Sequence, residues 1–349
     1  MICPGCLKQQ EQEGLSTDLS VRNEVKAEAS AKAGFCRKCL KELFDGKRVD
    51  SILPFHSPSQ EESNLYSDLT KKMSISGVQV KYSLGLTDGK LILTERGGQY
   101  ILKPIPTGQF RNLDQVPANE HLTMQLAKQL FKLSTPSNAI IHFRDGSPAY
   151  MVRRFDVKQD GSKFQQEDFA QLAQITEETH GKNYKYDLSY EEIGALIKQH
   201  ISMHQVEMEK FFRLVLFNYV FSNDDAHVKN FSVIQAEAGD YVLTPAYDLL
   251  CTRIHTPSEA DVALTLFKDD FSEAFNAYGF YTHFDFFLFG KKLGIKESRV
   301  LKIIDEFKNR ETEVSSLIKK SFLKEDIKIL YMDFYKDKIK RLKIEWAGS

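Results

Sequence analysis

Hydrophobic and polar positions alternate differently in two successive parts of the chain. Short β-like runs come first, at Val78 to Leu86, Leu91 to Thr94, Tyr100 to Lys103 and Ala139 to Phe143. Among them lies one helix-like segment, Ala118 to Phe131, with leucines recurring along one face. From Gln166 onward the period is helical over long segments, Tyr190 to His200, Val206 to Phe221 and Lys296 to Ile318, with strand-like pieces between Phe231 and Leu243. The pattern predicts an α+β protein with a small mixed lobe and a larger, mainly helical one.

Changes in composition suggest where these parts begin. Residues 1–60 form a predicted N-terminal extension, which contains a polar stretch at 7–33. A connector rich in Pro, Ser and Glu at 51–63 leads from it into the main body. Residues 61–156 form the small lobe, and its end, Ala149 to Asp156, is the expected hinge. Residues 157–349 form the helical lobe.

Charge and hydropathy exclude several classes of protein. The 47 Lys and Arg against 48 Asp and Glu give a net charge of -1, which argues against broad electrostatic capture of nucleic acid or an anionic membrane. The most apolar stretch, Phe211 to Phe221, is short and interrupted by polar residues, so we expect a cytoplasmic protein. The basic run from Lys336 to Lys343 is interpreted as a solvated helix face.

Four of the five cysteines form two C-x-x-C pairs, Cys3 with Cys6 and Cys36 with Cys39. Two thiolates at this spacing can bind one tetrahedral Zn²⁺, so the two pairs together predict a structural zinc site. The alternative is a poorly ordered extension that contains two cysteine pairs, because the stretch between them is longer than in compact zinc ribbons.

The strongest candidate for chemistry is the polar loop from Asn223 to Asn230, between an apolar helix and a strand. In the kinase catalytic loop the base Asp and the metal-binding Asn have the same separation as Asp225 and Asn230. Asp248 closes an apolar run after a predicted hairpin, where kinases place a second carboxylate that binds Mg²⁺. Leu249 and Leu250 follow it in place of the Phe-Gly of common protein kinases. Ordinary turn chemistry remains the alternative for such a loop.

Two features of the small lobe fit phosphate binding. Lys103 ends a strand and Glu120 lies near the start of the next helix, the arrangement with which kinases hold the α- and β-phosphates. The segment Ser74 to Lys81 contains Gly77, which would let backbone amides approach a phosphate. A lysine at a strand end, a helix-start glutamate favoured by the dipole, and a simple turn are the alternatives.

Taken together, these segments resemble the HipA-like kinase family in the same order. The resemblance covers roughly residues 70 to 320. The matching motifs are Ser76-Gly77-Val78-Gln79 with Lys81, Ile101 to Pro104, Asn119-Glu120-His121, Arg154-Phe155-Asp156, Glu167-Asp168-Phe169, Asp225 to Asn230, and Pro245-Ala246-Tyr247-Asp248. The family comprises bacterial toxin kinases with a bilobal protein-kinase-like fold, which phosphorylate aminoacyl-tRNA synthetases and so inhibit translation.

The resemblance implies an ATP- and Mg²⁺-dependent serine/threonine kinase. Asp225 would be the catalytic base, and Asn230 and Asp248 would hold Mg²⁺. The ATP site would comprise Ser76, Gly77, Val78, Gln79, Lys81, Lys103, Glu120, Arg153, Arg154, Phe155, Asp156, His227, Lys229, Asn230, Tyr247 and Asp248. The backbone around Arg153 to Phe155 would meet the adenine, and Asp156 the ribose.

The phosphate loop resembles the autophosphorylation site of the family. Ser74 and Ser76 match the two-serine form of the HipT-type branch, whose members are short and lack the N-terminal domain of longer HipA proteins. Phosphates there would repel ATP or displace the loop. The HipT resemblance also implies two partners, a HipB-like DNA-binding antitoxin and a HipS-like small protein.

Two rival functions remain. A catalytically silent, kinase-like scaffold that binds ATP is disfavoured because Lys103, Asp225, Asn230 and Asp248 are all present. A zinc-dependent nucleic-acid binder is disfavoured by the near-zero net charge and by the lack of interleaved aromatic and basic residues near the cysteines. No membrane association and no direct sequence-specific binding of nucleic acid are expected.

Overall fold

The computed structural model describes residues 1–10, 34–58, 80–95, 97–158, 160–237, 239–256 and 260–346. The chain divides into two compact units. Unit 1 comprises Met1–Gln125, Pro136–Arg154 and Lys319–Leu323, and unit 2 comprises Leu126–Thr135, Phe155–Ile318 and Lys324–Ser349. The chain therefore leaves unit 1 within a helix and again directly after Arg154.

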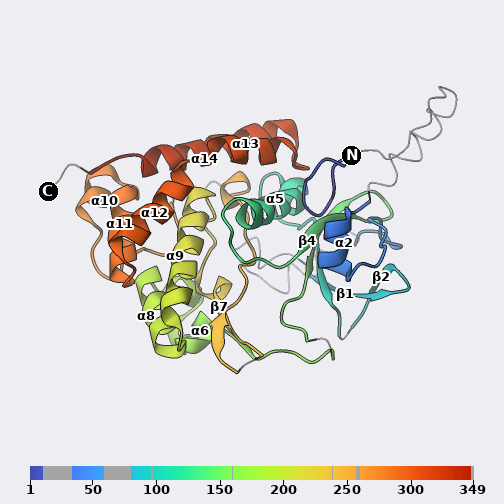
Figure 1. Cartoon of the computed structure of the whole chain (residues 1–349), viewed down its shortest axis with the longest axis horizontal. Helices are drawn as coiled ribbons and strands as arrows, with labels where there is room; N and C mark the ends of the chain where they lie inside the picture. The colour runs from blue at the N-terminus through green and yellow to red at the C-terminus, as the bar shows by residue number, and fades with distance from the viewer. Residues whose placement is uncertain are drawn as a thin grey trace. The chain divides into compact units, whose positions relative to one another are not determined.

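Unit 1 is built on a five-stranded antiparallel sheet with the order β2-β1-β3-β5-β4. Strands β1, β2 and β4 of this sheet are labelled in Figure 1. Its strands are β1 (Tyr82–Thr87), β2 (Lys90–Leu93), β3 (Tyr100–Pro104), β4 (Asn138–His142) and β5 (Pro148–Arg153). The predicted runs therefore form strands with bounds shifted by a few residues. The expected hinge begins instead as β5, which pairs with both β3 and β4, because its apolar residues Ala149 to Met151 are buried in the sheet.

The N-terminal segments and, among the described residues, three helices complete unit 1. The helices are α2 (Arg37–Phe44), the short η1 (Leu113–Gln115) and α5 (Val116–Gln129), whose last residues belong to unit 2. Residues 51–53 lie alongside the edge strand β4. Ile52 forms a parallel β-bridge with His142, and the Leu53 amide donates a hydrogen bond to the His142 carbonyl. Cys3, Phe35, Cys39 and Leu43 share one hydrophobic core with the sheet residues Tyr100 and Leu102. The N-terminal segments thus pack on the sheet because this removes their apolar side chains from water.

Unit 2 is mainly helical and contains one small sheet, β6-β7-β8, of antiparallel strands. The strands are β6 (Gln166–Asp168), β7 (Ser232–Gln235) and β8 (Tyr241–Leu243). The helices are α6 (Phe169–Leu172), α7 (Glu177–His180), η2 (Tyr184–Tyr186), α8 (Tyr190–His200), α9 (His204–Val220), η3 (Val228–Asn230), η4 (Thr252–Ile254), α10 (Glu273–Tyr278), α11 (His283–Lys292), α12 (Glu297–Lys308), α13 (Glu311–Lys319) and α14 (Glu325–Leu342).

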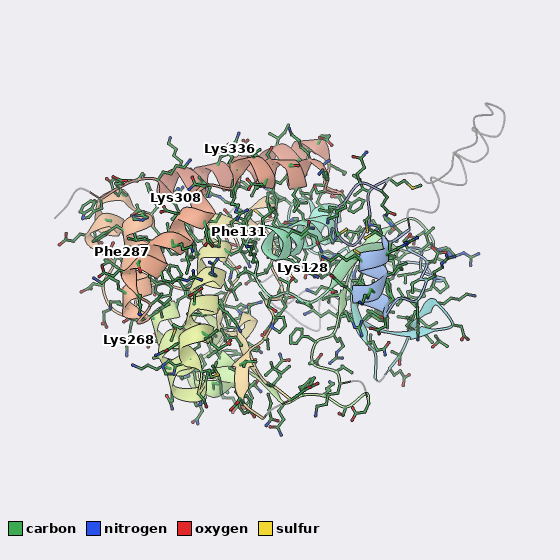
Figure 2. All side chains as sticks on the ribbon, in the orientation of Figure 1. Lys128, Phe131, Lys268, Phe287, Lys308 and Lys336 are labelled. Carbon is green, nitrogen blue, oxygen red and sulfur yellow. The ribbon has the colours of Figure 1, made fainter. Side chains whose placement is uncertain are left out.

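Helix α9 lies at the centre of unit 2, with α8 beside it (Figure 1). Its buried residues lie on one face in the first half and all round the helix from Val215 to Val220, as expected for a helix whose C-terminal end is enclosed by others. Phe131 packs edge-on against Phe217 and Phe221 of this helix region and lies 4.5 Å, centroid to centroid, from Phe307 of α12 (Figure 2). These aromatic contacts hold the helix that leads directly into the polar loop at 223–230.

Two expectations about the C-terminal helices were wrong. The single helix expected from Lys296 to Ile318 is two helices, α12 and α13, separated at Asn309 and Arg310. Lys338, expected to be solvated, is buried in α14, where its ammonium group pairs with Asp261 together with Arg341. Lys336 keeps the exposed position predicted for it (Figure 2). No helix of the described ranges is both long and apolar enough to cross a bilayer.

Candidate active site

In unit 1, Lys103 and Glu120 form a buried ion pair. The Lys103 ammonium nitrogen lies 2.6 Å from Glu120 Oε1, and the two residues are 5% and 3% exposed. Lys103 comes from β3, paired opposite Tyr150 of β5, and Glu120 comes from the beginning of α5. Desolvating two charges is costly, so a pair this deeply buried requires that both members stay together. The arrangement is the Lys-strand and Glu-helix pairing that the sequence predicts.

In unit 2, the Asp225 carboxylate is held by an aromatic hydroxyl. The Tyr186 hydroxyl donates a 2.8 Å hydrogen bond to Asp225 Oδ1. The Lys185 ammonium nitrogen lies 4.0 Å from the same oxygen, and His227 Nε2 lies 3.9 Å from it. The Asp225 side chain is 13% exposed. A carboxylate oriented by a hydroxyl and with a lysine nearby is suited to receive a proton from a substrate.

His227 is neutral in this setting. Burial, followed by the charge of Lys185, lowers its pKa to about 3. Its ring packs edge-on against Tyr186, with centroids 5.4 Å apart. At neutral pH the imidazole therefore adds no positive charge beside Asp225, whereas the Lys185 ammonium group does.

The backbone of the loop is fixed from two sides. Thr252, in η4, accepts a hydrogen bond from the Asp224 amide at 2.9 Å, and its hydroxyl lies 3.0 Å from the Ser222 carbonyl. The buried Tyr190 hydroxyl donates to the Ala226 carbonyl at 2.9 Å. Ser222 has a φ of 51°, which turns the chain sharply after α9. The position of Asp225 is thus set by residues distant in sequence.

The two expected Mg²⁺ ligands follow the loop and the hairpin. Asn230 ends η3, and its buried Oδ1 has no hydrogen-bond partner among the described residues. Asp248 follows the β7-β8 hairpin in the left-handed conformation, with φ 54°. Its backbone carbonyl oxygen is 3.5 Å from Nδ2 of the Asn223 side chain. An amide oxygen and a carboxylate are ligand types that Mg²⁺ takes. A buried acceptor without a donor costs free energy, and a bound cation would satisfy it.

Tyr247 joins these two elements. Its hydroxyl donates to the Lys229 carbonyl at 3.0 Å and lies 2.6 Å from the Ser232 hydroxyl. The Tyr247 ring stacks on Phe155 with centroids 5.9 Å apart. Lys229 reaches the Tyr184 hydroxyl at 3.3 Å. Tyr247 therefore links the loop at Lys229, next to Asn230, to Phe155 at the start of one segment of unit 2.

The other predicted ATP-binding residues lie in several places. Arg153 makes a bidentate pair with Asp45 at 2.8 and 2.9 Å, so its side chain is directed to the end of α2, while the Arg154 amide donates to Gln99. The Asp156 carbonyl accepts a hydrogen bond from the Phe164 amide. Lys81 is exposed just before β1. Ser74, Ser76, Gly77, Val78 and Gln79 lie outside the described residues.

The four N-terminal cysteines come together in unit 1. The sulfur atoms of Cys3, Cys6, Cys36 and Cys39 all lie within 4.8 Å of one another, a donor set that can hold a metal ion. The sulfurs of Cys6 and Cys36 are 3.7 Å apart, and none of these cysteines is in a disulfide. The fifth cysteine, Cys251, is buried in unit 2, and burial raises its pKa to about 12.

Sequence reasoning did not identify the residues that orient this site. Tyr186 and Lys185 lie close to Asp225, and Thr252 binds the Asp224 amide. These residues are far from the 223–230 loop in the chain, so no spacing rule marks them. The fully buried His121 was assigned no role, although it directly follows Glu120. Its position next to Glu120 is the feature of the sequence that could have indicated a role for His121.

Comparison with known proteins agrees with this geometry. Residues 73–314 match the family described as HipA-like C-terminal domain. The chain belongs to this family. The HipA-like resemblance and the bilobal, mixed α/β kinase-like fold predicted from the sequence are thereby confirmed, since solved HipA and CtkA structures are its structural neighbours.

Individual relatives of this HipA-like chain are named as kinases. A Haemophilus influenzae protein named "Putative kinase" is 29% identical over 310 residues, which is 84% of this chain and 88% of the relative. A Sinorhizobium fredii protein of similar description is 27% identical and is matched over 59% of its length.

Two solved structures show the same fold. HipA of Shewanella oneidensis, solved with HipB and operator DNA, superposes with a TM-score of 0.60 at 20% identity, over 77% of this chain and 63% of that one. The Helicobacter pylori proinflammatory kinase CtkA superposes with a TM-score of 0.50 at 14% identity, over 74% of this chain and 90% of that one.

Proposed function

We propose that this HipA-like protein is an ATP- and Mg²⁺-dependent serine/threonine kinase and acts as a toxin. The observation that carries the proposal is the set of phosphoryl-transfer groups present in the two units. Unit 1 supplies a buried Lys103–Glu120 pair at 2.6 Å, and unit 2 supplies Asp225, Asn230 and Asp248 around one ordered loop. A buried ion pair and a buried amide oxygen that lacks a hydrogen-bond partner among the described residues are not typical of a surface turn.

The proposed reaction moves the γ-phosphate of ATP to a protein hydroxyl. The hydroxyl oxygen bonds to the γ-phosphorus, the bond to the oxygen of the departing ADP breaks, and Asp225 accepts the hydroxyl proton. Tyr186 orients Asp225 for that step through its 2.8 Å hydrogen bond. Lys103, aligned by Glu120, binds the α- and β-phosphates. Mg²⁺ held by Asn230 and Asp248 would neutralise phosphate charge.

The remaining nucleotide contacts follow the family pattern. In this proposal the backbone at Arg153 to Phe155 meets the adenine, and Asp156 meets the ribose. The Phe155–Tyr247 stack supports this because it offers an aromatic surface beside the metal-binding segment. The cofactors of the proposal are ATP and Mg²⁺, with structural Zn²⁺ at the four cysteines.

We place the protein in the HipT-type branch, with an aminoacyl-tRNA synthetase as substrate. Its partners would then be a HipB-like antitoxin and a HipS-like small protein, and its location the cytoplasm. Support comes from the two-serine motif at Ser74 and Ser76. The solved HipA complex with HipB and operator DNA is consistent with a partner of the first kind.

The test of this function is transfer of labelled γ-phosphate to a panel of aminoacyl-tRNA synthetases. Wild type should label one synthetase and stop translation in a cell-free system, and Asp225→Ala should do neither. Label on the protein itself alone would leave the kinase and remove the proposed substrate. ATP binding without any transfer would favour the silent scaffold.

Autophosphorylation needs a separate experiment. Wild type should incorporate label within the peptide that contains Ser74 and Ser76, and the double alanine variant should lose that label. Glu-substituted serines should weaken ATP binding, since negative charge repels phosphate. Unchanged incorporation in the double alanine variant would contradict the proposed site.

A further inference from the structure

We propose that Cys3, Cys6, Cys36 and Cys39 hold one Zn²⁺, and that this site fixes the beginning of helix α5, beside Glu120, to the N-terminal segment. The Cys6 and Cys36 sulfurs are 3.7 Å apart. Tetrahedral zinc with bonds of about 2.3 Å separates two sulfurs by about 3.8 Å. The spacing of this pair therefore suits the ion.

Each cysteine pair lies in a local structure suited to metal binding. In the first pair, the Cys3 amide donates to the Lys8 carbonyl and Leu7 adopts a φ of 60°, which closes a tight turn. In the second pair, Cys36 caps the N-terminus of α2, and its amide donates to Cys3 Sγ at 3.3 Å. Helix N-termini and amide donors stabilise thiolates, the form of cysteine that binds metal.

Gly5 shows how closely the two pairs approach. A Cβ atom at Gly5 would lie 2.7 Å from the Cys39 sulfur and 3.0 Å from its Cβ. A larger residue there would push the two cysteine pairs apart. The first turn thus needs glycine because the second pair packs directly against it.

Disulfides explain the cluster less well than a metal does. A disulfide joins two sulfurs at about 2.05 Å, whereas the Cys6 and Cys36 sulfurs are 3.7 Å apart and none of the four cysteines is in a disulfide. Here all four sulfurs lie within 4.8 Å of one another. A tetrahedral ion uses all four at once.

The first cysteine turn contacts the sheet and α5 directly. The Pro4 carbonyl accepts a hydrogen bond from the Ile140 amide of β4 at 3.0 Å. The Gly5 carbonyl lies 3.2 Å from Nε2 of His121, whose side chain is fully buried. His121 directly follows Glu120, and Glu120 accepts the hydrogen bond from Lys103. The chain of contacts therefore runs from the cysteine turn to the ion pair in two steps.

The second pair is tied to the sheet through α2, which lies against the strands of unit 1 (Figure 1). The Tyr100 hydroxyl donates to the Leu43 carbonyl at 2.8 Å. Arg153 of β5 binds Asp45 just after the helix. With zinc bound, both cysteine segments hold the sheet and α5 together. The expected effect of the zinc site on ATP binding rests on the proposed kinase function.

Metal content of the purified full-length chain tests the site itself. Elemental analysis of protein from zinc-supplemented cells should give one zinc per chain, and Cys36→Ser with Cys39→Ser should remove it. Cys251→Ser is the matched control and should keep the zinc. Alkylation of the denatured, chelator-treated wild type should modify all five cysteines. Metal-free wild type, or cysteines recovered as disulfides, would overturn the proposal.

Hydrogen–deuterium exchange tests the connection to α5 without relying on kinase activity. Stripping zinc with a chelator should speed exchange in residues 116–125 and leave α8 of unit 2 unchanged. His121→Leu should keep the zinc and lose the link, which should weaken binding of a fluorescent ATP analogue by up to about tenfold. His180→Leu, at an exposed histidine, is the control. Unchanged exchange in 116–125 would refute the link, whereas absent binding by wild type would instead refute the kinase function.

Discussion

In unit 1 the Lys103 and Glu120 charges meet each other at 2.6 Å and are almost wholly buried. In unit 2 Asp225 is held by the Tyr186 hydroxyl, and the loop around it is held by Thr252 and Tyr190. Lys103 and Glu120 thus hold each other in position, whereas Asp225 is held in position by residues around it. A substitution in unit 1 should therefore cost stability as well as activity, and one at Asp225 should cost activity with little change in stability.

The largest effect is expected at Asp225. Asp225→Asn keeps the size of the side chain and an acceptor for Tyr186 but removes the base, so the transfer rate should fall by about 10²- to 10⁴-fold. The thermal midpoint should stay close to that of wild type. Steady-state kinetics beside calorimetry checks this, and a large loss of stability would break the proposed contrast between the units.

Substitution in the Lys103–Glu120 ion pair should, unlike that at Asp225, lower the stability of the protein. Lys103→Met leaves the Glu120 carboxylate buried without its partner, which should lower the free energy of unfolding by about 3–5 kcal/mol. Adding Glu120→Leu should restore most of that loss while leaving the enzyme inactive. Chemical denaturation of the single and double variants measures both, and equal stability of the two would argue that the pair is not tightly coupled.

Acid should destabilise the protein through its buried histidines. Burial lowers the pKa of His227 to about 3 and that of His121 to about 4. Because an unfolded histidine titrates near 6.5, the unfolded state binds more protons below that pH, and stability falls as the pH drops toward these values. Between pH 6.5 and 5 each histidine should cost on the order of 2 kcal/mol. Denaturation curves of wild type and His227→Asn over this range should differ in slope.

The smallest effect is expected at Tyr186. Tyr186→Phe removes one hydrogen bond to Asp225 and keeps the ring against His227, so the rate should fall by about tenfold or less. ATP affinity should not change. Kinetics at saturating ATP measures the rate, and a loss as large as that of Asp225→Asn would assign Tyr186 a direct part in the chemistry.

Local patterns in the sequence predicted much of this structure. Helix α8 spans the predicted Tyr190 to His200, and the β7-β8 hairpin precedes Asp248 as expected. These features depend on periodicity and turn residues within one segment. Family motifs likewise identified Lys103 and Glu120, which the structure brings together.

Local patterns could not predict contacts between residues that are far apart in the sequence. Tyr186 and Thr252 act through hydrogen bonds to a loop far along the chain. Lys338 was wrongly expected to face solvent because its partner, Asp261, lies far away in the sequence. A break such as that at Asn309 also depends on how the following helix packs.

The most direct test of the account is transfer of labelled phosphate by wild type and Asp225→Asn, with Mg²⁺ or with a chelator of Mg²⁺. The account predicts label from wild type with Mg²⁺ alone, and ATP binding but no label from Asp225→Asn. Equal label from both proteins would contradict it, because Asp225 would then not be the base of a metal-dependent kinase.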